Sequence, residues 1–148
     1  MNWDWAIVTA IATILGVIGG LVSVIFLILE VRRNAQAIEG ATVQSLMSFE
    51  KDVFALIANN AALYLKGSTG LSKLTAAQQL TYNRIVGVQM SLTYSAYVQF
   101  QNKLIDDEVW EAYFNALKHY MQAPGFCESW KSFETHYPKS FRDTVNDR

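Results

Sequence analysis

The side chains best suited to metal binding or nucleophilic chemistry in this sequence are two histidines, His119 and His136, and a lone cysteine, Cys127. A metal site built on helices needs two or more ligands that are one turn apart. His119 has no such partner. The acid nearest to His136, Glu134, is two residues away and therefore lies on the other side of a helix. We expect no metal site and no cofactor.

The other reactive residue types also lack a catalytic pattern. A single cysteine cannot form an internal disulfide, and a free thiol suits a reducing compartment. We interpret Cys127 as a structural residue because no base can be assigned to it. The acids from Asp106 to Glu111 fit the first turn of a helix, where the helix dipole favours negative charge. Nucleophile motifs and phosphate-binding loops are absent, so the sequence predicts a protein that is not an enzyme.

The charge balance excludes another class of function. The chain has 12 Lys and Arg against 13 Asp and Glu, which gives a formal net charge of −1. Proteins that bind nucleic acid concentrate Lys and Arg on one face. We therefore expect no nucleic-acid partner.

A long uncharged segment near the N-terminus predicts a membrane-spanning helix. No charged side chain occurs from Trp5 to Leu29. As a helix, these about 25 residues would extend over about 37 Å, more than a hydrocarbon core of about 30 Å. A signal peptide would have a basic start, a shorter apolar core and a small-residue cleavage site. We therefore expect the segment to remain as an anchor in contact with membrane lipid.

The residues that flank this segment predict its orientation. Trp3 and Trp5 are of the type that settles at the boundary between water and lipid, and Arg32 and Arg33 close the other end. Arginine-rich flanks face the cytoplasm. We expect an inner-membrane protein with its N-terminus, including Asp4, outside and its C-terminal domain in the cytoplasm.

Two series of residues divide the anchor into a bulky face and a small face. Both series step alternately by four and three residues, and they are offset by two positions, which places them on nearly opposite sides of a helix. The bulky series is Ile7, Ile11, Ile14, Ile18, Leu21, Ile25 and Ile28. The small or polar series is Thr9, Thr13, Gly16, Gly20 and Ser23, continued by Leu27, Glu30 and Asn34. We call this second series the small-residue stripe.

The small-residue stripe predicts association between helices. Nothing drives isoleucine out of lipid, whereas close approach of two backbones needs small side chains. Gly16 and Gly20 also form a GxxxG pair. The series continues through Ala37 and Ala41, so one helix should run from lipid into water with the same face against a partner. A homo-oligomer of scaffold or assembly type is the leading interpretation.

Two other functions remain open at this stage. The same stripe could line an ion channel, with hydroxyls from Thr9, Thr13 and Ser23, a constriction at Leu27 and a ring of charge at Glu30. In that case the ligands would be cations. Alternatively, the protein could be an accessory subunit of a larger membrane complex.

The rest of the chain predicts a helical domain. We place the anchor with its flanks in residues 1–33 and a cytoplasmic domain in residues 34–148. Apolar residues recur at helical spacing in four segments, and the last of these, from Phe126 to Tyr137, is expected to end at Pro138. Thr75 with Gln78 predicts a capping box, and Asp106 predicts an N-cap. The expected fold is all-α, an N-terminal transmembrane helix that continues into a small antiparallel helical bundle.

Two motifs resemble those of a family of small bacterial single-pass membrane proteins. The first is LILEVRRNAQAIEGATVQ at the membrane exit, and the second is LIDDEVWEAYFNALKHYMQAPGFCESWKSF near the C-terminus. The resemblance covers nearly the whole chain. The matching residues are Glu30, Arg32 and Asn34 in the first motif, and Trp110, Glu111, Pro124, Gly125 and Trp130 in the second. It implies the same architecture and carries over no catalytic residue.

Overall fold

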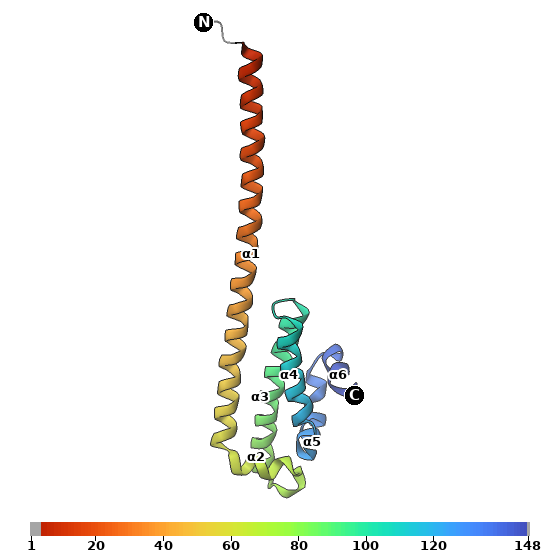
Figure 1. Ribbon diagram of the computed structural model, residues 1–148. Coiled ribbons are helices and arrows are strands. Elements are labelled where there is room, and N and C mark those ends of the chain that lie inside the picture. The colour runs from red at the N-terminus through yellow and green to blue at the C-terminus, as the bar shows by residue number, and fades with distance from the viewer. Residues whose placement is uncertain (1–3, 148) are drawn as a thin grey trace. The chain divides into compact units, whose positions relative to one another are not determined.

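A computed structural model describes residues 4–147, and all regular structure in this range is helical. The helices are α1 (Trp5–Asn59), α2 (Ala61–Ser68), α3 (Ala76–Gln101), α4 (Asp107–Tyr120), α5 (Pro124–Phe133) and α6 (Lys139–Asn146), as Figure 1 shows. Two short 3-10 turns, η1 (Leu71–Lys73) and η2 (Glu134–His136), complete them. No strand occurs between residues 4 and 147, which confirms the all-α prediction.

The chain divides into two compact units, one up to Gly40 and one from Ala41 onward. The division falls within α1, which continues through Gly40 without interruption. The boundary expected after residue 33 also lies inside this helix. The expected passage of one helix beyond the apolar segment is therefore confirmed.

Side-chain caps begin the two central helices of the second unit as the sequence predicts. Thr75 Oγ1 accepts from the backbone N–H of Gln78 at 3.3 Å, and Gln78 Oε1 accepts from the N–H of Thr75 at 3.1 Å. Asp106 Oδ1 accepts from the N–H of Val109 at 2.8 Å. Each bond satisfies an N–H group that the helix itself leaves unpaired. The capping box and the N-cap are both confirmed.

Helix α1 ends at Asn59, which the periodicity of the apolar residues does not predict. Asn60 leaves the helical conformation, and its Nδ2 donates to the carbonyl oxygen of Leu56 at 2.9 Å. An asparagine side chain can replace the backbone as a hydrogen-bond partner in this way. The chain then turns into the short helix α2, so the first of the helical segments after the anchor is divided in two.

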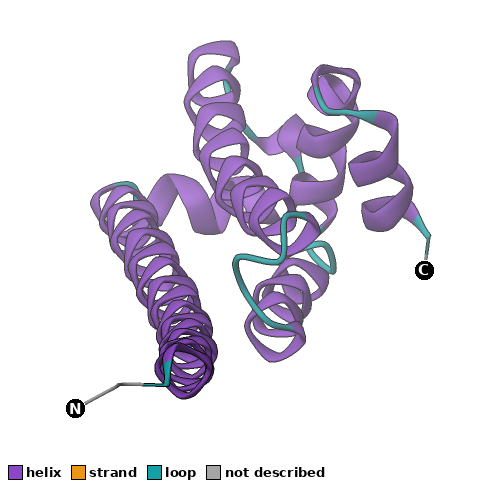
Figure 2. Ribbon diagram, turned by 90° about the horizontal axis from the view of Figure 1, so that it is seen from above, coloured by secondary structure: helices purple, strands orange, loops and turns teal. Residues whose placement is uncertain are grey.

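Helix α3 forms the centre of the second unit. It contacts α2, α4 and α5, and α4 runs antiparallel to it after a short loop (Figures 1 and 2). One buried cluster joins α3 to α5 and α6 through Tyr82, Trp130 and Phe141. The other joins the last turns of α1 to α3 and α4 through Leu46, Leu92 and Trp110. The aromatic residues from Tyr94 to Phe141 are therefore core residues, as their helical spacing indicates.

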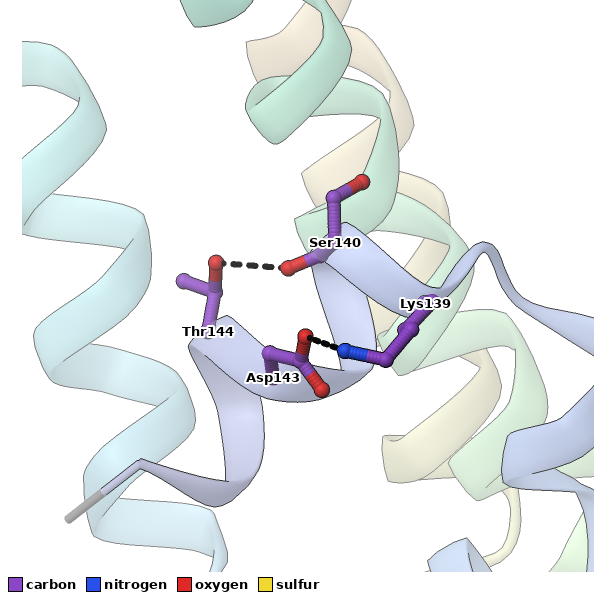
Figure 3. Close-up of polar contacts among 4 residues, drawn as sticks. All are labelled: Lys139, Ser140, Asp143 and Thr144. Atoms are coloured by element: carbon purple, nitrogen blue, oxygen red, sulfur yellow. Dashed lines mark hydrogen bonds and ion pairs between the residues drawn. The ribbon is translucent and has the colours of Figure 1, made fainter.

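The C-terminal segment corrects one prediction. Helical structure does not end at Pro138, because this proline precedes the first residue of α6. Proline is compatible with a helix start, where its missing N–H removes no hydrogen bond. Helix α6 buries Phe141 and Val145 completely, and Figure 3 shows its polar side, where Lys139 Nζ lies 2.7 Å from Asp143 Oδ2. The segment predicted to end at Pro138 does stop before this residue, as α5 at Phe133 followed by η2, but α6 was not predicted.

Gly125 allows the backbone of α5 to approach that of α2, and Gly67 allows α2 to pack against Tyr82 of α3. A Cβ atom at Gly125 would lie 1.8 Å from the carbonyl oxygen of Gly67. A Cβ atom at Gly67 would lie 2.3 Å from the ring of Tyr82. Both distances are far below van der Waals contact, so no other residue type fits at either position without movement of its neighbours.

The buried side chain of Tyr82 is expected to make the second unit less stable at alkaline pH. Its hydroxyl is buried and has no hydrogen-bond partner among residues 4–147, and burial is the main cause that raises its pKa above 10. The pKa of Tyr82 is higher in the folded chain than in the unfolded chain, where it is about 10. The contribution of Tyr82 to the free energy of unfolding is therefore fully present below pH 10 and is lost as the pH rises further. Tyr82→Phe should reduce this loss by up to about 1.4 kcal/mol per pH unit. It should leave the neutral-pH stability unchanged or higher.

Denaturant unfolding of the full chain in detergent, followed by near-UV circular dichroism from about pH 8 to about pH 11, measures this effect. The control is Tyr94→Phe, at a tyrosine that packs in the same core. Burial also raises the pKa values of Tyr64, Tyr113, Tyr120 and Tyr137, so part of the alkaline loss should remain. Equal slopes for the wild-type and Tyr82→Phe proteins would contradict the prediction.

Candidate functional site

The first unit contains α1 up to Gly40 and has no core of its own within the described residues. The helix is long and apolar enough to cross a membrane, by length and composition (Figure 1). All side chains from Asp4 to Gly40 are exposed within the chain. Large apolar residues such as Phe26 (70%) and Leu15 (63%) are among them. Such a surface is stable only where lipid or another protein covers it.

The helix brings the predicted small-residue stripe onto one face. With about 100° per residue, its members from Thr9 to Asn34 fall within a sector of about 100°. The bulky residues from Ile7 to Ile28 occupy a similar sector on nearly the opposite side. The geometry of α1 thus keeps the two faces separate over the whole apolar segment.

No contact among the described residues, 4–147, explains the glycines of this segment. A Cβ atom at Gly16, Gly19 or Gly20 would meet no atom within 4 Å. This contrasts with Gly67 and Gly125, where a Cβ atom would collide with the chain itself. The absence of side chains at Gly16 and Gly20 therefore leaves a shallow open surface on the stripe.

The hydroxyl groups of the stripe bond to their own helix. Thr9 Oγ1 donates to the carbonyl oxygen of Trp5 at 2.8 Å, and Thr13 Oγ1 donates to that of Thr9 at 2.9 Å. Ser23 Oγ donates to the carbonyl oxygen of Gly19 at 2.9 Å. Since each donor is satisfied inside the helix, these residues can lie in an apolar environment without water.

The polar end of the stripe is different. Leu27, Glu30 and Asn34 follow on the same face and are exposed within the described chain. Glu30 makes no ion pair or hydrogen bond within the described range, 4–147. Arg32 and Arg33 are also exposed beside it, and Trp5 is 76% exposed at the other end. Trp3, the other predicted interface residue, lies outside the described residues.

Most of the residues that match the C-terminal motif contribute to the packing or the helix starts of the second unit. Trp110 and Trp130 are buried in the two core clusters. Pro124 is the first residue of α5, and Gly125 makes the close approach to α2. Glu111 is exposed on α4. These five residues therefore do not converge on a catalytic arrangement.

The candidate metal ligands and the cysteine are also dispersed. His119 is exposed in the last turn of α4, and His136 is exposed in η2. Cys127 is half-buried, and its Sγ donates to the carbonyl oxygen of Met121 at 2.9 Å. Between residues 4 and 147, no three His, Cys, Asp or Glu residues gather as a metal-binding group.

A groove between α3 and the α5–η2 segment is the feature that the sequence analysis missed. It encloses about 450 Å³ and includes Arg84, Gly87, His136 and Tyr137. The hydroxyls of Tyr137 and Ser91 are 3.2 Å apart across it. Gly87, in the middle of a long helix, was the one local signal for it, because the lining residues outside α3 come from a segment that begins about 45 positions later in the sequence.

No family model matches the chain, and no curated protein or solved structure matches it.

Proposed function

We propose that this protein is a homo-oligomeric, single-pass inner-membrane protein of scaffold or assembly type, without enzymatic activity. Its apolar helix associates through the small-residue stripe, and its helical unit lies in the cytoplasm. The observation that carries the proposal is that Gly16 and Gly20 share one exposed face of α1, where a Cβ atom would meet no atom of residues 4–147 within 4 Å. A partner helix supplies the contact that the chain itself does not.

The energetics of glycine in helices support this proposal. A glycine in a helix interior is less favourable than alanine by about 1 kcal/mol in water. Within the chain, no contact of Gly16 or Gly20 offsets this difference. Between membrane helices, however, small residues allow the backbones to approach closely and to gain van der Waals contact. The stripe gives every copy of the chain such a surface.

The hydroxyl groups favour a closed bundle over a water-filled pore. Thr9, Thr13 and Ser23 already donate to carbonyl oxygens of their own helix. They therefore need no water and can pack directly against a neighbouring helix. The same hydroxyl oxygens can still accept hydrogen bonds from a partner.

We expect Gly16→Ile combined with Gly20→Ile to dissociate the oligomer, because branched side chains would hold the helices apart. The control is Ala10→Ile, which introduces a branched side chain about 100° away from Thr9, at the edge of the bulky face. Analytical ultracentrifugation in detergent measures the protein mass of each particle. A multimeric wild type, a multimeric control and a monomeric double variant support the proposal. A monomeric wild type or an unchanged mass of the double variant contradicts it.

An ion channel is the alternative, because Glu30 lies on the same face and has no hydrogen-bond or ion-pair partner in the described part of the chain. A ring of carboxylates at the pore mouth would favour cations. Reconstituted protein should then conduct cations, and Glu30→Gln should reduce the selectivity for cations. If an intact oligomer shows no conductance, the channel is excluded and the scaffold function is retained.

If purification from native membranes brings a stoichiometric partner, the protein is an accessory subunit instead.

A further inference from the structure

The groove of the second unit is lined by both apolar and polar side chains. Leu80 and Val88 of α3 and Phe133 of α5 supply the apolar surface. Arg84, Ser91 and Tyr137 supply polar groups around it. A volume of about 450 Å³ is in the range of pockets that hold small molecules, and a few polar groups around an apolar surface are typical of them.

Gly87 distinguishes this groove from an accidental depression. It lies within α3, where alanine would stabilise the helix, and a Cβ atom there would meet nothing within 4 Å. Close packing within the chain therefore does not require glycine at this position. Gly87 does line the groove, and its carbonyl oxygen accepts from the Tyr137 hydroxyl at 3.5 Å. The missing side chain leaves room for a molecule to approach the helix backbone.

The polar groups of the groove select a negatively charged ligand. Arg84 has no ion pair or hydrogen bond with any residue between 4 and 147, so its guanidinium is available. His136 adds a ring N–H donor, whereas no acidic residue lines the groove. Glu134, the acid of the same 3-10 turn, instead accepts from Asn146 Nδ2 at 3.4 Å. Arginine binds carboxylates through two parallel hydrogen bonds.

We propose that the groove between α3 and the α5–η2 segment is a binding site for a small organic anion with an apolar body. Arg84 binds the anionic group, and the apolar body lies over Gly87 between Leu80, Val88 and Phe133. Such a site would give the cytoplasmic unit a soluble ligand. It is independent of the small-residue stripe, because it depends only on residues of the second unit.

The probe is 2-naphthoate, and the matched neutral and cationic compounds are 2-naphthol and 2-naphthylmethylamine. Methyl-labelled full-length protein in lipid nanodiscs reports the site through the resonances of Leu80 and Val88, whereas those of Leu46 and Val53 report the other core cluster. We expect saturable shifts at Leu80 and Val88 with 2-naphthoate and much weaker effects with the other two compounds. This readout is specific to the site even if the probes also enter the bilayer.

Three variants complete the test. Arg84→Gln should weaken 2-naphthoate binding about tenfold, as expected for the loss of a charge-assisted hydrogen bond. Gly87→Ala should weaken binding while it raises the resistance of the unit to denaturant, which separates loss of the site from loss of the fold. Lys131→Gln removes an exposed charge of α5 outside the groove and should change affinity less than twofold. Equal binding of 2-naphthol, equal effects of Arg84→Gln and Lys131→Gln, or no shift at Leu80 and Val88 would overturn the proposal.

Discussion

Gly125→Ala is expected to lower the free energy of unfolding of the second unit by about 3 kcal/mol, at the upper end of the usual range for overpacking. The added methyl group would lie 1.8 Å from the carbonyl oxygen of Gly67 and 2.9 Å from its carbonyl carbon. Both are backbone atoms, so no side-chain rotation can relieve the collision. Helix α5 would have to move away from α2, and Phe126 and Trp130 would lose part of their burial.

Denaturant unfolding of the full chain in detergent, followed by near-UV circular dichroism, measures this change. The control is Gly87→Ala, which makes the same substitution in α3, where the new Cβ atom meets nothing within 4 Å. It should raise the free energy of unfolding by about 0.5 to 1 kcal/mol. A Gly125→Ala protein that is as stable as the wild type would show that the two helices are not in backbone contact.

These two substitutions are expected to change the free energy of unfolding in opposite directions. The glycines of the chain can be divided in the same way, by whether a contact inside the chain requires them. Gly67 and Gly125 are required by contacts inside the chain. Gly16, Gly20 and Gly87 have space around them and gain nothing from the fold. Under the two proposals above, Gly16 and Gly20 contact a partner helix and Gly87 contacts a small ligand, whereas Gly19 and Gly40, which are equally free of neighbours, have no such assignment.

The parts of the fold that depend on local sequence were predictable. The caps at Thr75 and Asp106 are made by residues three positions from their partners, so their side-chain types alone indicate them. The continuity of α1 follows from the regular repeat of its residues, and the stripe on α1 needs only helix geometry. For the candidate site, sequence could therefore define the face of α1, but not what covers it.

The parts that depend on distant contacts were not predictable. Helix α6 has only Phe141 and Val145 as buried apolar residues, too few for a clear period. The contact of Gly125 with Gly67, and the groove beside Gly87, join segments that are far apart in the sequence. Tertiary packing decides such features, and no pattern within a single helix contains them.

Trp130→Ala is expected to cause the other large loss, about 3 to 5 kcal/mol, because it removes the largest fully buried side chain of the unit. The indole is 1% exposed. It lies 5.4 Å from the ring of Tyr137 and 6.2 Å from that of Phe141, measured between ring centroids. Its Nε1 donates to Asn146 Oδ1 at 3.2 Å, which fixes α6 on α5. The variant should therefore release α6 as well as create a cavity.

Comparison with Asn146→Ala separates these two contributions. That substitution removes the same hydrogen bond, together with the exposed one from Asn146 Nδ2 to Glu134, but leaves the indole in place, and it should lower the free energy of unfolding by only about 1 kcal/mol. Hydrogen exchange of the α6 amides measures the release of this helix, and denaturant unfolding measures the stability of the whole unit. Trp5→Ala, at a residue that is 76% exposed, should change neither. If Trp130→Ala costs no more than Asn146→Ala, the indole does not fill the core, and the packing of α5 and α6 around it is not as described.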